Sequence, residues 1–276
     1  MSAGRMGAAT VRESLFAARE ALFPIANEEA AFSARLLLCH ALGVSDLLPL
    51  YASPMPEAAQ TVLSAYVARR LSGEPLQYIL GEWEFMGLPF YVERGVLIPR
   101  QDTETLAEHA VSLIAAHGYK TALDLCCGTG CIGISLHKLA GIAVTLADID
   151  DTCLALARKN AARNAVSAQV LQSDLFGAIS ERFDLIACNP PYIPTGELSS
   201  LQKEVQAEPQ IALDGGADGL KFYRRIAAAY KSRLNAGGAL LLEVGISQAD
   251  DVKKLFENAY TVKDLNGVER VVAVTG

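Results

Sequence analysis

The chain has 276 residues, of which 51% are hydrophobic and 20% charged, and its formal net charge is −7. This composition is typical of a soluble globular protein with room for one large domain and a small one, and it excludes wholesale disorder. Neither the part up to Arg100 nor the remainder carries an excess of basic residues. Since a protein that grips a long nucleic acid needs a positive surface, we expect no stable nucleic-acid binding.

No membrane or targeting segment is expected. No apolar run reaches the roughly 18–20 residues of a membrane helix, and residues 1–12 lack the hydrophobic stretch of a signal peptide. These features predict a cytoplasmic protein. Three of the six cysteines, Cys126, Cys127 and Cys131, crowd around one turn, but they show neither a CxxC pair nor zinc-type histidine spacing. We expect reduced cysteines and no metal.

Residues 10–72 are predicted to form a small unit of short helices. Apolar residues recur at helical spacing over residues 30–39, and Gly43 supplies a stop signal. The helical pattern returns over residues 57–71. No residue of this unit has the features of a catalytic group.

Residues 83–98 are aromatic and β-branched, with two interrupting turn signals, which predicts a strand pair. A helix should follow, with Asp102 or Thr103 as its N-cap and Glu104 in its first turn. These patterns divide the chain into an N-terminal helical domain over residues 1–80, a hairpin linker over 81–101 and a C-terminal domain over 102–276.

After residue 118 strands and helices alternate, which indicates a mostly parallel sheet with helices on both faces. Asn266-Gly267 is a strong hairpin signal near the end of the chain. The predicted fold is therefore α/β and Rossmann-like, with a seven-stranded sheet that ends in an antiparallel hairpin. The predicted strands are 120–126, 142–147, 168–172, 183–188, 238–244, 259–265 and 268–274, and the predicted helices are 130–140, 151–165, 218–234 and 248–258.

A glycine turn follows the first strand of this alternation. Gly128 and Gly130 stand where the strand ends and a helix begins, and they allow a tight turn and close approach to a ligand. Open α/β sheets bind their ligands at this edge. The spacing differs from the GxGxxG of pyrophosphate binders. Asp124, just before the turn, suits a ligand that carries an ammonium group, although it can instead accept backbone N–H bonds of the loop.

Acidic residues also end the next two strands. Asp148 is placed to bind ribose hydroxyls, whereas Asp150 or Asp151 is expected to cap the following helix. After the third strand, Asp174 is expected to meet an adenine amino group and Leu175 its face. Three acidic strand ends in order indicate a nucleoside cofactor without phosphate, for which S-adenosyl-L-methionine is the candidate.

The fourth strand is followed by Asn189-Pro190-Pro191-Tyr192. Such a sequence can simply end a strand, but its place at the ligand-binding edge favours catalysis. Asn189 can accept one N–H of an amide or aromatic amine through its side-chain oxygen, and the Pro190 carbonyl can accept the other. Two prolines preorganise these acceptors, and Tyr192 offers a flat face for stacking. No general base is required, since approach geometry and electrostatics supply most of the rate.

These features resemble the S-adenosylmethionine-dependent methyltransferases with an (Asn/Asp/Ser)-Pro-Pro-(Tyr/Phe/Trp) motif, which modify adenine, cytosine or glutamine. Further segments narrow the resemblance to the PrmC/HemK family, and the likeness covers nearly the whole chain. These segments are residues 69–81 (RRLSGEPLQYILG), 84–90 (EFMGLPF), 97–104 (LIPRQDTE) and 208–220 (EPQIALDGGADGL).

The resemblance implies N5-methylation of the glutamine in the Gly-Gly-Gln loop of class I peptide chain release factors, with S-adenosyl-L-homocysteine as the second product. It also implies that the helical N-terminal domain helps to grip the release factor. The expected cofactor positions are Asp124, Cys126, Cys127, Gly128, Thr129, Gly130, Asp148, Asp174, Leu175 and Asn189. The expected substrate positions are Asn189, Pro190, Pro191, Tyr192, Arg100 and an aromatic wall from Phe85 or Phe90.

The chain departs from the family pattern at two places. Gln101 stands where proline is usual, but Arg100 and Glu104 remain, so activity should survive. Cys126-Cys127 replaces a common glycine and threonine, and Cys127 could make the site sensitive to oxidation. Two other hypotheses are an N6-adenine methyltransferase acting on RNA or DNA and a non-catalytic cofactor-binding protein. The acidic balance argues against the first, and the intact motifs argue against the second.

Overall fold

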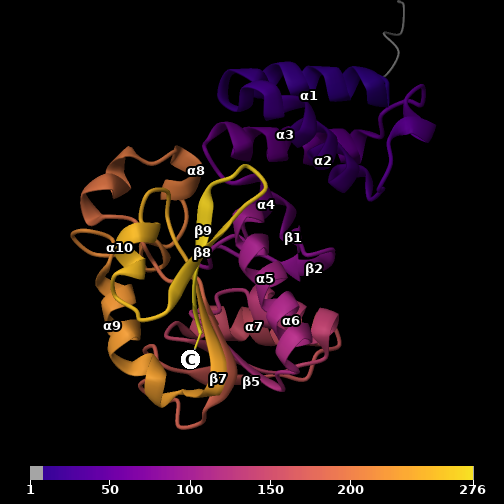
Figure 1. Cartoon of the computed structure of the whole chain (residues 1–276). Coiled ribbons are helices and arrows are strands. Elements are labelled where there is room, and N and C mark those ends of the chain that lie inside the picture. Colours follow the sequence, from indigo (N-terminus) through magenta and orange to yellow (C-terminus); the bar gives the residue numbers. More distant parts are fainter. Residues whose placement is uncertain (1–8, 276) are drawn as a thin grey trace, which may run out of the picture. The chain divides into compact units, whose positions relative to one another are not determined.

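The computed structural model describes residues 9–275, and the chain divides into two compact units after Leu80 (Figure 1). The prediction that residues 1–12 contain no signal peptide concerns mostly residues 1–8, which lie outside the described residues. Among the described helices, none is long and apolar enough to cross a membrane.

The first unit is helical, as predicted. It consists of α1 (Val11–Ala26), η1 (Asn27–Glu29), α2 (Ala30–Leu42), η2 (Leu48–Leu50), α3 (Glu57–Leu71) and α4 (Leu76–Leu80). Thr10 starts α1 with a capping box to Glu13, and Gly43 ends α2 in the left-handed conformation. Leu22 and Leu37 are fully buried between these helices.

The second unit opens with the predicted hairpin, in which β1 (Glu82–Phe85) pairs antiparallel with β2 (Leu88–Tyr91). Next comes α5 (Gln101–His117). The prediction that Asp102 or Thr103 caps this helix is wrong, because Arg100 holds the N-cap position and no side chain caps the first turn. Tertiary contacts have recruited the two side chains instead: Asp102 pairs with Arg270, and Thr103 contacts Asn189.

The sheet of the second unit contains seven strands in the order β5-β4-β3-β6-β7-β9-β8. The first five strands of this order are parallel, and β9 is antiparallel to both of its neighbours. The predicted fold class, with its antiparallel closing hairpin, is confirmed. The strands are β3 (Thr121–Leu125), β4 (Ala143–Asp148), β5 (Gln169–Gln172), β6 (Phe183–Cys188), β7 (Leu234–Glu243), β8 (Ala259–Lys263) and β9 (Glu269–Thr275).

Helices cover both faces of this sheet, as the alternating pattern predicts. They are α5, α6 (Cys131–Ala140), α7 (Asp151–Arg163), α9 (Lys221–Ala229) and α10 (Ala249–Lys253), whose buried residues belong to the clusters on the two faces. The loop after β6 contains η3 (Thr195–Ser200), α8 (Lys203–Gln206) and η4 (Gln210–Ala212), and η5 (Tyr230–Ser232) follows α9. Leu106 of α5 and Ile134 of α6 share one buried cluster, and Tyr223 of α9 belongs to another. Ala122 and Leu123 of β3 enter these opposite clusters, so the central strands are buried on both sides.

Candidate functional site

A cavity of about 330 Å³ lies at the carboxyl ends of β3, β4 and β6, the edge at which the sequence predicts a ligand. Its volume is within the range of small-molecule sites. Its walls come from the glycine turn, the acidic strand ends, the segment before α5, the loop after β6 and the start of α9. The predicted site residues that line it are Arg100, Cys126, Cys127, Gly128, Thr129, Asp148, Asp174, Leu175, Asn189 and Pro191.

The glycine turn is held by backbone hydrogen bonds to β4. The Cys127 amide donates to the Ala147 carbonyl at 3.0 Å, and Gly130 then turns the chain into α6 with a φ of 78°. A third glycine, Gly133, has a role that the sequence analysis missed. A Cβ atom there would lie 2.4 Å from Leu146 Cδ2, so only glycine lets α6 pack this closely on β4.

Asp148 anchors the turn and also lines the cavity. One carboxylate oxygen accepts from the Gly128 amide at 2.9 Å, and the other accepts from the Asp150 amide at 3.0 Å. Burial nevertheless raises the pKa of this carboxyl. Asp150 caps α7 through bonds from the Thr152 and Cys153 amides, which confirms one of the two predicted caps.

Asp124 lies beneath the turn and outside the lining of the cavity. One of its oxygens accepts from the Gly133 amide at 2.8 Å. This is a bond to a backbone N–H group, which the sequence analysis gave as the alternative to a contact with an ammonium group. The other oxygen, Oδ1, is buried without a hydrogen-bond partner among residues 9–275. Burial raises the pKa of Asp124 to about 8, and the charge of Asp148 adds to this shift.

Beside the third strand end, Asp174 and Leu175 both reach the cavity. Asp174 forms an ion pair with Arg225 of α9 at 2.8 Å, a partner that the sequence did not indicate. Both side chains are about half exposed, so this pair contributes little stability. Phe222 faces the same cavity, with the Lys221 ammonium 5.2 Å from its ring centroid.

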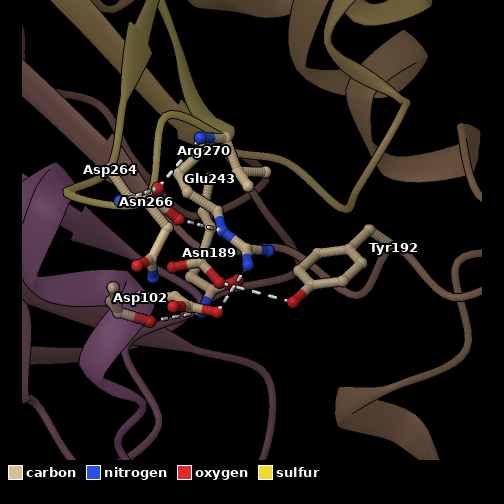
Figure 2. A network of polar contacts seen from close by, with 9 residues as sticks. Asp102, Asn189, Tyr192, Glu243, Asp264, Asn266 and Arg270 are labelled. Atoms are coloured by element: carbon tan, nitrogen blue, oxygen red, sulfur yellow. Dashed lines mark hydrogen bonds and ion pairs between the residues drawn. The ribbon is translucent and has the colours of Figure 1, made fainter.

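The tetrapeptide after β6 sends two of its side chains into the cavity and two away from it. Asn189 and Pro191 line the cavity, whereas Pro190 and Tyr192 lie outside the lining. The Asn189 amide Nδ2 donates to Thr103 Oγ1 at 3.3 Å, and the Tyr192 hydroxyl donates to Glu243 Oε1 at 3.4 Å (Figure 2). Burial raises the pKa of Tyr192, so the phenol keeps the proton that it donates.

Glycines of the segment 208–220 pack against the backbone of Tyr192. A Cβ atom on Gly215 would lie 2.7 Å from the Tyr192 carbonyl carbon, and one on Gly219 would lie 2.4 Å from the Tyr192 oxygen. That oxygen also accepts from Gln248 Nε2 at 2.9 Å. Glycine is required at these two positions because a side chain there would prevent the returning loop from packing against residues 189–192.

Arg100 reaches the cavity but is also held from behind by Glu208. Glu208 has a side chain only 1% exposed, forms an ion pair with the Arg100 guanidinium, and accepts from the Ile98 amide at 2.9 Å. Burial raises the pKa of Glu208, although the charge of Arg100 opposes this. The pair thus ties the segment before α5 to the loop after β6.

The expected aromatic wall from Phe85 or Phe90 is wrong in this structure. Both rings are buried in the core, at 1% and 0% exposure, with their centroids 6.2 Å apart. They pack with Leu106 in the cluster between α5 and the sheet, because the hairpin turns its apolar face inward. Apolar cavity walls come instead from Ile98 and Phe222, among others.

Polar residues at the site that the sequence analysis did not assign include Thr103, Glu208, Arg225, Glu243 and Gln248. Glu243 carried the signal used for Asp148, because it is an acidic residue at the end of an apolar strand. Thr103 and Glu208 stand in segments that carry the family resemblance, but no local pattern indicates their contacts. Within residues 9–275 no group of three metal-ligating side chains occurs.

A seven-stranded sheet of this order, with a glycine turn after its first strand and Asn-Pro-Pro-Tyr after its fourth, defines the class of Rossmann-like methyltransferases. The family model "Methyltransferase small domain" matches residues 102–215, and "PrmC N-terminal domain" matches residues 13–81. The chain belongs to the family of release factor glutamine methyltransferases, and it is a methyltransferase.

Two relatives carry this assignment, and one solved structure shares the fold. The release factor glutamine methyltransferase of Geobacter sulfurreducens is 42% identical, with 95% of each chain covered. That of Chlorobaculum tepidum is 39% identical, with 88% of this chain and 89% of the relative covered. The T. thermophilus 16S rRNA N2 G1207 methyltransferase, solved with AdoMet and guanosine, has a TM-score of 0.52 at 22% identity, covering 70% of this chain and 49% of that one. This last likeness shows the fold alone.

Proposed function

We propose that this protein methylates the N5 side-chain amide of the glutamine in the Gly-Gly-Gln motif of class I peptide chain release factors. The observation that carries the proposal is the orientation of Asn189. Its Nδ2 is engaged by Thr103, so the side-chain oxygen is left to accept a hydrogen bond on the side of the cavity. The names of the relatives support a release factor as the substrate.

S-adenosyl-L-methionine is the proposed methyl donor, and the residues present fit it. Asp148 lines the cavity and can accept from ribose hydroxyls beside its bonds to the Gly128 and Asp150 amides, and Leu175 offers an apolar face to adenine. The unpartnered oxygen of Asp124 beneath the turn favours a cationic ligand above it. The solved methyltransferase of the same fold holds AdoMet, which also supports this cofactor. When bound, the cofactor supplies an electrophilic methyl group on a sulfonium sulfur and leaves as S-adenosyl-L-homocysteine.

The tetrapeptide then binds and orients the glutamine amide. Asn189 Oδ1 accepts one N–H of the amide and the Pro190 carbonyl accepts the other, which aims the nitrogen lone pair at the methyl group. A primary amide nitrogen is a weak nucleophile, so holding it in the reacting geometry lowers the barrier most. After the N–C bond forms, the nitrogen gives one proton to water.

The N-terminal helical unit, residues 9–80, is proposed to bind the body of the release factor in the cytoplasm. Among residues 9–275, the lining of the catalytic cavity comes from the second unit. Recognition of the substrate protein is the role that we assign to the first unit.

One assay tests this function. The protein is incubated with methyl-labelled S-adenosyl-L-methionine and a class I release factor, beside the same factor with its loop glutamine replaced by alanine, and beside structured RNA. We expect label only in the unchanged release factor. Label that is independent of the glutamine, or that goes to RNA, would contradict the proposal.

A further inference from the structure

Behind Asn189 lies a short chain of polar side chains from three different elements. Thr103 of α5 accepts from Asn189 Nδ2 at 3.3 Å, and its hydroxyl lies close enough to Glu243, at the end of β7, to lower the pKa of that carboxyl. Thr103 and Glu243 are 3% and 2% exposed. Glu243 Oε2 is buried without a hydrogen-bond partner in the described part of the chain. Figure 2 shows the contact of the Tyr192 hydroxyl with the Glu243 carboxylate.

Which of these side chains donates and which accepts follows from the single hydrogen of the Thr103 hydroxyl group. Thr103 can give that hydrogen to Glu243 or to Asn189, but not to both. A hydrogen bond to a carboxylate is stronger than one to a neutral amide, so the hydrogen goes to Glu243 while that group is ionised. The lone pairs of Thr103 then face Asn189, which must turn its NH2 group toward Thr103 and its oxygen toward the cavity.

The opposite direction would invert the polarity of the cavity. If Thr103 gave its hydrogen to Asn189 Oδ1, the Asn189 amide would flip and present its NH2 group to the substrate. A substrate –NH2 group would then meet a donor, and one of its N–H bonds would stay unsatisfied in a buried site. A carboxylate would fit such a cavity better than an amide.

We propose that Thr103 and Glu243 are positioning residues that fix the orientation of the Asn189 amide, so that the cavity accepts a side-chain amide and rejects a carboxylate. This inference rests on the proposed function, in which Asn189 Oδ1 accepts from the substrate nitrogen. Thr103 borders the cavity but acts through Asn189, and Glu243 acts through Thr103.

The surroundings of Glu243 shift its pKa in both directions. Arg270 of β9 lies close enough to lower the pKa of Glu243, but it also pairs with Asp102 and with Asp264, each at 3.0 Å. Burial dominates and raises the pKa of Glu243 to about 7. The groups that face Glu243 from the packed elements are Asp102, Thr103, Cys131, Tyr192, Tyr223 and Arg270.

Two substitutions of Thr103 test the inference. Thr103→Val keeps the shape but removes the hydroxyl, and we expect a loss of about 30-fold in kcat on the release factor, because an orphaned amide is left. KM for S-adenosyl-L-methionine should stay within about 3-fold, since the loss concerns orientation of the reacting amide. Thr103→Ser keeps the hydroxyl and should restore kcat to within about 3-fold of the wild type.

A double substitution separates positioning from general damage. If Thr103 acts only through Asn189, Thr103→Val should lower kcat no further in an Asn189→Ala background, measured under single-turnover conditions. An equal further loss in that background, a wild-type kcat for Thr103→Val, or a serine variant as slow as the valine variant would each overturn the inference.

A readout without catalysis keeps the inference distinct from the proposed function. In protein labelled with ¹⁵N-asparagine, the Asn189 NH2 pair is identified by its absence in Asn189→Ala. We expect nuclear Overhauser contacts between this pair and Thr103, and slow exchange that speeds up about 10-fold in Thr103→Val. A pair that shows no contact with Thr103 sinks the inference even if the release factor is methylated. If the wild type fails to methylate the release factor but the contact is present, the proposed function alone fails.

Discussion

Asp148 and Glu243 end β4 and β7 in the same way, with an acidic side chain after an apolar run, yet their surroundings differ. Asp148 borders the cavity and accepts two backbone amides. Glu243 is enclosed by side chains, and within residues 9–275 its Oε1 accepts from Tyr192 while its Oε2 has no hydrogen-bond partner. The same strand-end position thus gives one carboxylate that can meet a ligand and one that orders its neighbours.

The Asn189 side chain gives the sharpest single-residue prediction. Asn189→Ala removes the oxygen that would accept the substrate N–H, so kcat should fall by about 10²–10³-fold, as for other preorganised hydrogen-bond groups. Asp148 and Leu175 remain, so the cofactor Kd measured by calorimetry should change less than about 3-fold. A Kd that rises in step with the loss of kcat would assign Asn189 mainly to the cofactor.

Residues with a local signal could be predicted from the sequence, and residues without one could not. Asp148 and Asn189 directly follow apolar strands, so their place at the ligand-binding edge was predictable. The partners of the site come from far along the chain: Thr103 is 86 residues from Asn189, and Ile98 is 110 residues from Glu208. No periodicity reports such contacts. The buried hairpin phenylalanines were misplaced for the same reason.

At the scale of elements, the loop between β6 and α9 is the part that shapes the catalytic edge. Ile193 donates to the Leu213 carbonyl at 2.9 Å, and Gly215 donates back to the Ile193 carbonyl at 2.8 Å. Glu208 binds Arg100 from within the same loop. The tetrapeptide is therefore held from both sides, by the sheet and by its own returning loop.

The effect of the close approach of this loop on stability can be measured with two glycines of equal φ. Gly219 and Gly237 both have a φ of 73°, but a Cβ atom would clash with the Tyr192 oxygen only at Gly219, and nothing lies within 4 Å at Gly237. Gly237→Ala therefore reports the backbone strain alone, about 1 kcal/mol. Gly219→Ala should lower the free energy of unfolding by about 1–2 kcal/mol more and should also slow methyl transfer.

Urea unfolding of the two variants checks this, with circular dichroism to confirm that both fold. Equal losses of stability would mean that the loop does not press on Tyr192. An unchanged rate for Gly219→Ala would separate the loop contact from catalysis.

The order and type of the elements were predictable, but several ends were not. Strands β3, β4 and β6 match their predicted ranges within a residue or two, because each is a short and mostly apolar run. Helix α9 covers nine residues and α10 five, where longer helices were expected. At the end of α9 the chain tightens into η5, and after α10 it continues in turns up to Asn258, whose φ is 54°. Helical spacing alone does not reveal such tightening.

At the scale of the whole molecule, two buried carboxyls should govern stability around neutral pH. Burial raises the pKa of Asp124 to about 8 and that of Glu243 to about 7, from ordinary values of 3.8 and 4.5. The folded protein therefore holds protons that the unfolded chain has already lost. Its free energy of unfolding should fall as pH rises toward 8, by about 1–3 kcal/mol between pH 6.5 and 8.

Urea unfolding of the cofactor-free protein at a series of pH values measures this slope. Asp124→Asn keeps an acceptor for the Gly133 amide and should flatten the slope. Asp218→Asn is the matched control, because the pKa of that exposed carboxyl is lowered to about 2 and it does not titrate in this window. A slope that persists in Asp124→Asn and Glu243→Gln would contradict the assignment.

The hydrogen bonds that join the two ends of the loop after β6 also bear on which changes of loop length the protein tolerates. Because residues 193 and 215 are hydrogen-bonded to each other, the tip around η3 and α8 starts and finishes at one fixed point. The entropy of closing a loop grows only with the logarithm of its length, so doubling this tip costs about 0.6 kcal/mol. We expect insertions and deletions confined to η3 and α8 to leave the catalytic edge intact. The residues of this loop that hold Arg100 or line the cavity lie outside the tip: Glu208, Pro209, Ile211 and Ala212.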